Sequence, residues 1–492
     1  MKVQNNKADF KVALNWINGT WDSTGQITES INPSTGDVVG QFISADKAVV
    51  ASAILAARTA FDTTSWSTDT QLRAKAIEEL ASNIEKRIPE LALMLAREGG
   101  KLLQQTTFEM IGTVDNLRYS AASALILNAG RAMQTAPGVY FESSPVAMGV
   151  VGVITPWNSP IILTARVIGP ALAAGCTIVL KLPGQTGLTN ALFSEAIAES
   201  KLLPASVINV FSESGNVGAP LMVDSPMVNM INFTGSTTVG KLVSEAGAKT
   251  LKRINLELGG KTPLVVLDDA DLDSTIPYLV QALLMMNGQF CLTGSRVLVQ
   301  RSIADQVRNA LVEAYTSVKI GGSEDPDAQL GPVIDATSAK RIDAIVEESS
   351  TYAKILVRGG LITEGPLSKS GAFYRPSLVE VEDVKTPIVQ NEIFGPVQTF
   401  EIFDTDEEAI KLANATEYGL SGAVFTTSDT RSRNIGRSID AALVWTNCWG
   451  IFSEHFEQGG HKQSGVGLVS GPRAIEQFQE MKVYATRIPS KN

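Results

Sequence analysis

The sequence predicts an α/β protein in which two lobes, each built on a mainly parallel sheet, meet near Glu257. From Val146 onward, β-rich apolar runs alternate with helical patterns, as in βαβ units. A second series of the same kind begins near Pro263. The chain has 492 residues, 44% of them hydrophobic, and exceeds the length at which a single core usually divides. Two or three subdomains are therefore expected.

The amino-terminal part combines short strands with helices. Strands are expected around residues 16–19 and within 31–42, where residues 32–36 supply the turn. Apolar residues at three-to-four spacing predict helices over 46–61 and 71–98.

Seven apolar runs are the predicted strands of the two lobes. In the first lobe they are residues 150–154, 177–182, 207–211 and 228–233, and in the second 263–267, 296–300 and 423–426. Candidate helices lie between them.

Two further segments, 138–146 and 482–488, resemble strands with incomplete apolar faces. Unpaired strand edges tend to find partners, so a contact between subunits is expected here. The alternative is an intramolecular hairpin with a paired tail.

Composition limits the class of partner. Lys and Arg total 41 against 51 Asp and Glu, and the net charge of −10 disfavours nucleic acid. The first residues contain no apolar signal region, and the longest apolar runs are too short to span a bilayer, so no membrane partner is expected. Three widely spaced cysteines, Cys176, Cys291 and Cys448, suit a reducing compartment. We expect a cytoplasmic protein.

Histidine and metal chemistry have little support. The only histidines are His455 and His461, so a Cys-His or Ser-His pair would have to use one of them. No CxxC or HExxH motif occurs, and no metal is expected. Proton transfer is therefore assigned to a carboxylate.

Cys291 and Glu257 form a candidate pair of nucleophile and base. A thiolate attacks an electrophilic carbon, and a carboxylate deprotonates the water that releases a covalent intermediate. Gly288 permits close backbone approach, and a helix is expected from Phe290, whose positive end would favour thiolate. Burial in an apolar strand would raise the pKa of Glu257. The alternatives are a buried small hydrophobe for Cys291 and a solvated strand end for Glu257.

Two segments offer polar donors between a strand and a helix. The amide of Asn158 suits an oxyanion, although asparagine there is also a common turn or cap residue. Residues 235–241 suit phosphate at a helix N-terminus. Leu242 stands where a P-loop needs Ser or Thr, which argues against an NTPase. No GxGxxG motif follows a strand, so a dinucleotide would be held in a Rossmann variant.

Over essentially its whole length, the chain resembles the aldehyde dehydrogenase superfamily. The resemblance rests on residues 98–101, 155–160, 169–175, 233–236, 256–261, 288–291, 330–332, 392–396, 459–460 and 462–465. It implies an aldehyde dehydrogenase-like α/β fold in three parts. These are a Rossmann-variant cofactor domain (1–124 and 148–259), an α/β catalytic domain (260–459) and a small β oligomerisation arm (125–147 and 472–492).

The resemblance also implies oxidation of a small-molecule aldehyde by NAD(P)+ in a homodimer or homotetramer. Cys291 would form a thiohemiacetal and, after hydride transfer, a thioester. Asn158 and the Cys291 amide would stabilise the oxyanion, and Glu257 would activate water. Lys181 would contact the adenosine ribose, Ser236 the pyrophosphate, and Glu392 and Phe394 the nicotinamide ribose side. The expected cofactor contacts are Thr155, Pro156, Trp157, Lys181, Gly184, Gly235, Ser236, Leu258, Glu392 and Phe394.

One departure from the family pattern concerns the cofactor. Many NAD-preferring relatives carry a ribose-binding glutamate three positions after the lysine, where this chain has Gly184. Loss of that carboxylate removes repulsion against a 2′-phosphate and leaves Lys181 to attract it. NADP+ is therefore expected to be tolerated or preferred.

A second departure concerns the substrate. Arg166 stands eight residues after Asn158, where some relatives place an aromatic ring, and helical spacing directs both toward one face. Semialdehyde and hydroxybenzaldehyde dehydrogenases resemble this arrangement, which suggests a substrate carboxylate or phenolic oxygen near Arg166 and Ser159. Met285, where semialdehyde enzymes often add an arginine, favours an aromatic or mixed substrate. The alternative is an arginine paired with a local acid.

Two rival functions remain open. A CoA-acylating relative would pass the acyl group to CoA, although such relatives usually lack a base like Glu257. A non-catalytic binding protein on the same fold is the other, since fold alone does not guarantee activity.

Overall fold

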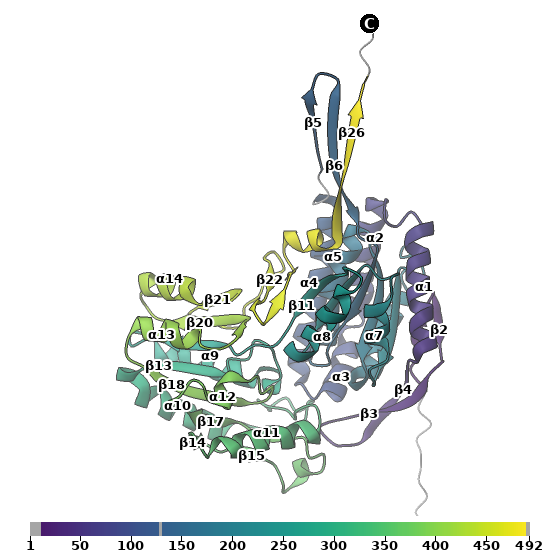
Figure 1. Ribbon diagram of the computed structural model, residues 1–492. Coiled ribbons are helices and arrows are strands. Elements are labelled where there is room, and N and C mark those ends of the chain that lie inside the picture. Colours follow the sequence, from purple (N-terminus) through teal and green to yellow (C-terminus); the bar gives the residue numbers. More distant parts are fainter. Residues whose placement is uncertain (1–10, 127–129, 489–492) are drawn as a thin grey trace, which may run out of the picture.

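The computed structural model describes residues 11–126 and 130–488. The amino-terminal stretch expected to lack a signal region, and the parts of the predicted arm at 127–129 and 489–492, lie outside them. Figure 1 shows two α/β bodies side by side, with a narrow β arm that projects from the first body.

The first body is built on a ten-stranded sheet with five parallel strands in the order β9-β8-β7-β10-β11. Their bounds are Val150–Ile154 (β7), Thr177–Pro183 (β8), Ile208–Glu213 (β9), Met230–Thr234 (β10) and Arg253–Glu257 (β11). In chain order this is 3-2-1-4-5, the order of a doubly wound dinucleotide-binding sheet. The four strands predicted in this lobe are confirmed.

Shorter strands extend this sheet. They are Asn15–Ile17 (β1), Thr20–Asp22 (β2), Gln26–Ile31 (β3), Val38–Ser44 (β4) and Gly465–Val466 (β24). Helices cover its two faces, as Figure 1 shows. They are Lys47–Thr63 (α1), Thr70–Lys86 (α2), Ile88–Gly99 (α3), Leu103–Ile126 (α4), Pro160–Ala174 (α5), Gly187–Ala198 (α6), Gly218–Asp224 (α7) and Thr237–Ala248 (α8).

The prediction of one helix over 71–98 is wrong. The segment is two helices, α2 and α3, which break at Arg87 and restart with Pro89 in the first turn of α3. Proline lacks a backbone N–H and is best accommodated in the first turn of a helix, which fits a new helix that starts just before Pro89.

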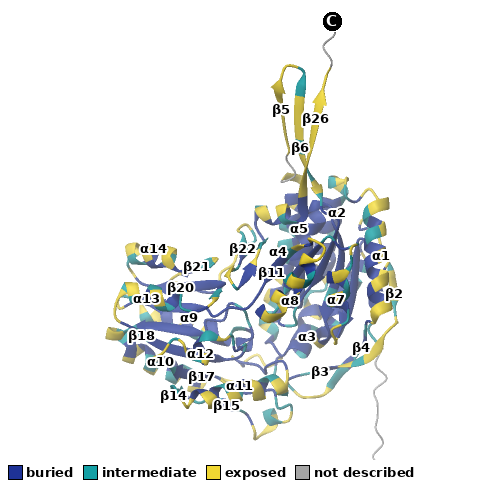
Figure 2. Ribbon diagram, in the orientation of Figure 1, coloured by how far each residue is buried: buried dark blue, intermediate teal, exposed yellow. Residues whose placement is uncertain are grey.

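The second body holds a seven-stranded sheet in the order β14-β17-β18-β13-β12-β20-β21. The three predicted strands are present as Pro263–Val266 (β12), Arg296–Gln300 (β13) and Ser421–Phe425 (β20). Lys354–Val357 (β14), Ser377–Glu380 (β17), Val397–Phe403 (β18) and Leu443–Thr446 (β21) complete the sheet. Leu272–Leu284 (α9), Ala304–Ser317 (α10), Ala336–Ser349 (α11), Asp406–Ala413 (α13) and Asp429–Ser438 (α14) cover it. In Figure 2 the central strands of both sheets are buried and the helices turn exposed sides outward.

The arm is a three-stranded antiparallel sheet. Arg131–Ala136 (β5) and Val139–Ala147 (β6) form a hairpin, and Gln479–Arg487 (β26) pairs with β6 along its length. Both predicted strands are therefore present, and they pair within one chain, as the alternative had it. Among the described residues no further strand pairs with the outer edge of β5 or β26, and Figure 2 shows the arm largely exposed.

The described helices include none long and apolar enough to cross a membrane. The chain passes from the first sheet to the second directly after Glu257, through residues 258–262. This crossing brings the carboxyl end of β11 next to the second body.

Candidate active site

A cavity of about 580 Å³ holds the two residues that the sequence singled out. Cys291 and Glu257 both line it, together with Arg166 and Ser159. Four aromatic side chains, Phe108, Phe290, Trp449 and Phe452, contribute to its wall. The predicted nucleophile, base and substrate residues therefore meet in one place.

Cys291 follows a backbone segment that is bent by left-handed residues. Met286, Asn287 and Gly288 have φ angles of 53°, 59° and 71°. The Asn287 side chain fixes this bend, since its Nδ2 donates to the carbonyls of Gly100 at 3.0 Å and Pro332 at 2.8 Å. Cys291 itself lies in a turn, so the helix expected from Phe290 is wrong.

The thiol of Cys291 is weakly acidic in this setting. Its pKa is raised to about 12, chiefly by burial and in part by the carboxylates of Glu392 and Glu257, while the charge of Arg166 acts in the opposite direction. Without a helix N-terminus beside it, the expected lowering of the pKa is also wrong. The thiol needs a base before it can act as a nucleophile.

Glu257 ends strand β11 and is 5% exposed. Its Oε2 accepts a hydrogen bond from Arg166 Nη2 at 3.1 Å, whereas Oε1 has no partner among the described residues. Burial raises the pKa of this carboxyl, and the charge of Arg166 opposes that rise. The alternative of a solvated strand end is therefore wrong.

Arg166, on helix α5, pairs with the candidate base. Besides its bond to Glu257, its Nη1 donates to Gln458 Oε1 at 3.1 Å. The structure thus shows the pairing with a local acid that was the alternative to a substrate anchor. Arg166 also lines the cavity, as Glu257 does, so the same side chain contacts the base and borders the space for substrate.

Asn158 and Ser159 stand at the start of α5. Asn158 is 5% exposed, and its Nδ2 donates to the carbonyl of Gln289 at 3.0 Å. An amide has two N–H bonds, so one remains for another acceptor. The start of α5 is held in place by Glu109, whose Oε1 accepts from the Ile161 N–H at 3.2 Å and whose Oε2 binds Lys101.

The expected cofactor residues of the first body follow the carboxyl ends of adjacent parallel strands. Residues 155–157 come after β7, Gly184 after β8, Gly235 and Ser236 after β10, and Leu258 after β11. Such ends share one edge of a sheet, where ligands of this fold bind. Ser236 is the N-cap of α8, and its hydroxyl accepts from Val239 N–H at 3.4 Å.

Glu392 and Phe394 reach this edge from the second body. Glu392 Oε1 accepts from Gly260 N–H at 3.1 Å, and burial raises the pKa of its carboxyl to about 7. Phe394 has a φ of 55°, and its ring meets Trp157 edge to face at 5.5 Å. The residues expected on the nicotinamide side therefore come from both bodies of the molecule.

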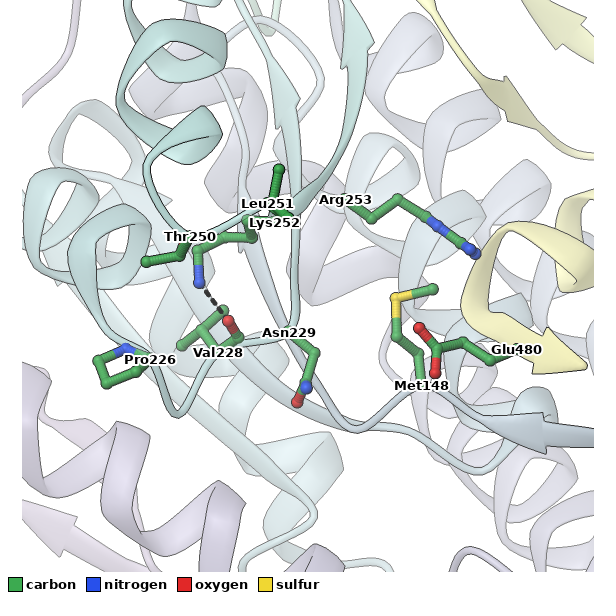
Figure 3. Close-up of a pocket in the computed structure, with 9 residues that line it drawn as sticks. All are labelled: Met148, Pro226, Val228, Asn229, Thr250, Leu251, Lys252, Arg253 and Glu480. Atoms are coloured by element: carbon green, nitrogen blue, oxygen red, sulfur yellow. Dashed lines mark hydrogen bonds between the residues drawn. The ribbon is translucent and has the colours of Figure 1, made fainter. Parts of the chain in front are cut away.

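A second cavity, of about 330 Å³, lies beside the base of the arm (Figure 3). Its lining includes Lys252 and Glu480. Lys252 Nζ donates to the carbonyl of Ser225 at 2.8 Å and to that of Val228. Since this ammonium is already bonded to the backbone, and neither Cys291 nor Glu257 lines the cavity, the predicted chemistry does not lie there.

Sequence reasoning missed two residues of the site, Gln458 and Asn287. Gln458 is 292 positions from its partner Arg166, so no local sequence pattern could predict their contact. Asn287 did carry a signal, because an Asn-Gly pair favours left-handed backbone.

Known proteins match the chain over nearly all its length. The family model for the aldehyde dehydrogenase family matches residues 20–484. Aldehyde dehydrogenase family 2 member C4 of Arabidopsis thaliana is 35% identical over 481 residues, 96% of this chain and 95% of its own length. A (Z)-2-((N-methylformamido)methylene)-5-hydroxybutyrolactone dehydrogenase of Acinetobacter baylyi is 32% identical over 475 residues, 96% of each chain. Betaine aldehyde dehydrogenase of Staphylococcus aureus, solved in complex with NAD+, superposes with a TM-score of 0.94 and 31% identity, covering 98% of this chain and 95% of that one.

Proposed function

The chain belongs to the aldehyde dehydrogenase family, and on this premise we propose that it oxidises an aldehyde to the carboxylic acid with NAD(P)+ through covalent catalysis by Cys291. The observation that carries the proposal is the shared cavity, which holds the Cys291 thiol and the Glu257 carboxyl together. A nucleophile and a base in one enclosed space are what formation and hydrolysis of a thioester require.

The residues at the edge of the first sheet fit a dinucleotide. The strand order is that of dinucleotide-binding sheets, and Ser236 at the N-terminus of the 12-residue helix α8 suits a pyrophosphate. Thr155, Trp157 and Phe394 would hold the nicotinamide half. When bound, the oxidised nicotinamide supplies a hydride acceptor.

Acylation begins with the thiol. Glu257, whose Oε1 has no partner among the described residues, takes the proton of Cys291 as sulfur bonds to the aldehyde carbon. The carbonyl oxygen becomes an oxyanion, which accepts hydrogen bonds from the free N–H of Asn158 and from the Cys291 amide. Collapse of this thiohemiacetal would give up a hydride to the oxidised nicotinamide and leave a thioester on Cys291.

Deacylation uses the same carboxylate. Once the proton taken from Cys291 has passed to solvent, the Glu257 carboxylate removes a proton from water, the resulting hydroxide bonds to the thioester carbon, and the C–S bond breaks to give the acid and the Cys291 thiolate. Arg166, at 3.1 Å, favours the ionised form of Glu257 that this step needs.

For the substrate we propose an aromatic aldehyde or a semialdehyde that carries a carboxylate or phenolic oxygen. The four aromatic side chains of the cavity wall favour a ring, because ring pairs gain more than their buried area alone. Arg166 and Ser159 would face the polar group. The Nε of Arg166, which has no partner among the described residues, leaves a donor available.

A screen of aliphatic, aromatic and semialdehyde substrates with both cofactors tests the function. Reduced nicotinamide should form with wild type and disappear in Cys291→Ala. Cys448→Ser is the matched control, because Cys448 does not line the cavity. Acyl-CoA formation that outruns acid release would favour the CoA-acylating rival, and no turnover of any aldehyde would favour a binding protein.

The anchor role of Arg166 needs a comparison between substrates, because Arg166 also holds Glu257. Arg166→Leu should slow deacylation of every substrate. On kcat/KM, which reports acylation, acidic or phenolic benzaldehydes should lose about tenfold or more beyond the loss seen with benzaldehyde. An equal loss of kcat/KM on both kinds of substrate would contradict the anchor role of Arg166.

A further inference from the structure

Strand β8 ends without the acid that its position in the sheet calls for. In sheets of this order, an acidic side chain near the end of the second strand accepts a hydrogen bond from the adenosine ribose 2′-hydroxyl of NAD. Here the second strand in chain order among the five is β8, which ends at Pro183 and carries Lys181 near that end. Gly184 follows it.

Position 184 is closed to any side chain. A Cβ placed on Gly184 would lie 2.2 Å from Ser214 Oγ, 2.8 Å from Ser214 Cα and 2.9 Å from Ser214 N. Two of these atoms are backbone, so a carboxylate could enter there only if the end of β9 moved. Ser214, the residue that follows β9, occupies that space.

The same strand supplies a carboxylate. Glu213 is the last residue of β9 and stands beside Pro183 in the parallel register of the sheet. It is 3% exposed. Its Oε1 accepts from the backbone N–H of Gly218 at 2.9 Å and from that of Val217, so one oxygen is fixed at the start of α7.

The other oxygen is poised for a ligand. Glu213 Oε2 is buried, has no hydrogen-bond partner among the described residues, and lies 3.9 Å from Lys181 Nζ. Two hydrogen bonds end to end span roughly 5.6 Å, so one hydroxyl oxygen can lie within bonding distance of both atoms. That hydroxyl would donate to Oε2 and accept from Nζ.

We propose that Glu213 is the carboxylate that binds the adenosine ribose and makes NAD+ the better cofactor. The assignment rests on the proposed NAD(P)+-dependent function. A 2′-phosphate would bring about two negative charges next to this buried carboxylate, and Lys181 offsets only part of the repulsion. The cofactor preference expected from Gly184 therefore becomes more specific. NADP+ is tolerated, and NAD+ is preferred.

Binding of the adenosine half alone tests the assignment without any turnover. Isothermal titration calorimetry would compare ADP-ribose with its 2′-phosphate on wild type, Glu213→Gln and Glu313→Gln. Glutamine keeps the oxygen that caps α7, removes the charge and replaces Oε2 with an NH2 group, which cannot accept from the ribose hydroxyl. Glu313, an exposed residue on α10 of the second body, is the control for loss of one negative charge.

Wild type should bind ADP-ribose at least about tenfold more tightly than the 2′-phosphate, and Glu213→Gln should shift that ratio at least about tenfold toward the phosphate. Glu313→Gln should leave this ratio unchanged. An unchanged ratio in folded Glu213→Gln would overturn the assignment. If that variant does not fold, wild type that prefers the 2′-phosphate would overturn it. Wild type that binds neither ligand would overturn both the assignment and the proposed function.

Discussion

Arg166 and Glu257 are the residues whose coupling most affects the chemistry of the site. Burial raises the pKa of the Glu257 carboxyl, and the guanidinium at 3.1 Å opposes that rise. A base acts in its ionised form, so the charge of Arg166 favours the form of the buried carboxylate that the chemistry needs. Substrate recognition and base activation then depend on the same arginine.

This coupling predicts a change in the pH profile of Arg166→Leu. Removal of the positive charge lets the pKa of Glu257 rise, so a higher pH is needed to ionise it. The acidic limb of kcat should therefore move to higher pH, measured by steady-state rates across the pH range. Arg301→Leu, which breaks an exposed ion pair with Asp404, should leave the limb in place. A limb that stays or moves to lower pH in Arg166→Leu would contradict the coupling.

At this scale the sequence indicated residue types better than their partners. Cys291, Glu257 and Asn158 lie in segments whose local pattern marks a strand end or a turn, and they could be named in advance. Gln458, which binds Arg166, and Glu213, which lies near Lys181, could not be named in advance. Each depends on which strands and loops become neighbours in space, and that information is not local.

The bent segment before Cys291 is the element on which the nucleophile depends. Gly288 has a φ of 71°, and a Cβ there would lie 2.4 Å from the carbonyl carbon of Gly395. A side chain would therefore strain the backbone and push the segment off its neighbour.

Gly288→Ala should be costly for this reason. Strain and overpacking together should lower the free energy of unfolding by about 2–6 kcal/mol and abolish turnover. Gly365 has a φ of 75° and nothing within 4 Å of a Cβ, so Gly365→Ala isolates the strain and should cost about 1–2 kcal/mol. Chemical denaturation of both variants measures the difference, and equal losses would mean that contact with Gly395 does not matter.

Elements were predictable where their apolar pattern was simple. Strand β7 appears at the predicted bounds, because a fully buried strand is a continuous apolar run. Helix α4 has no such pattern, since its buried face includes Thr106, Glu109 and Thr113. The helix expected after Phe290 failed because the left-handed residues before it turn the chain instead.

At the scale of the whole molecule, the arm is the part that points to another subunit. Met133, Met481 and Val483 are exposed on it, and no other described strand pairs with the outer edges of β5 and β26. Exposed apolar side chains on a sheet with open edges favour association with another copy.

We therefore expect a dimer or tetramer that forms through the arm. Light scattering after size-exclusion chromatography should give the mass of two or four chains for wild type and a smaller mass for the double variant Met481→Asp, Val483→Asp. Thr486→Asp places the same charge on the opposite face of β26 and should dissociate the assembly less. A monomeric wild type would contradict this expectation.

The central claim, that Cys291 carries the acyl group and Glu257 releases it, is tested most directly by trapping the thioester. In Glu257→Gln, kcat should fall about 10²–10⁴-fold because thiol deprotonation and hydrolysis both lose this base. The reaction is therefore run at raised pH, where more of the Cys291 thiol ionises and acylation still proceeds. The variant would be mixed with a substrate aldehyde and NAD(P)+, quenched in acid, digested and analysed by mass spectrometry. The account predicts that the peptide containing Cys291 gains the mass of the acyl group. Reduced nicotinamide formed in that reaction with the Cys291 peptide unmodified would contradict it.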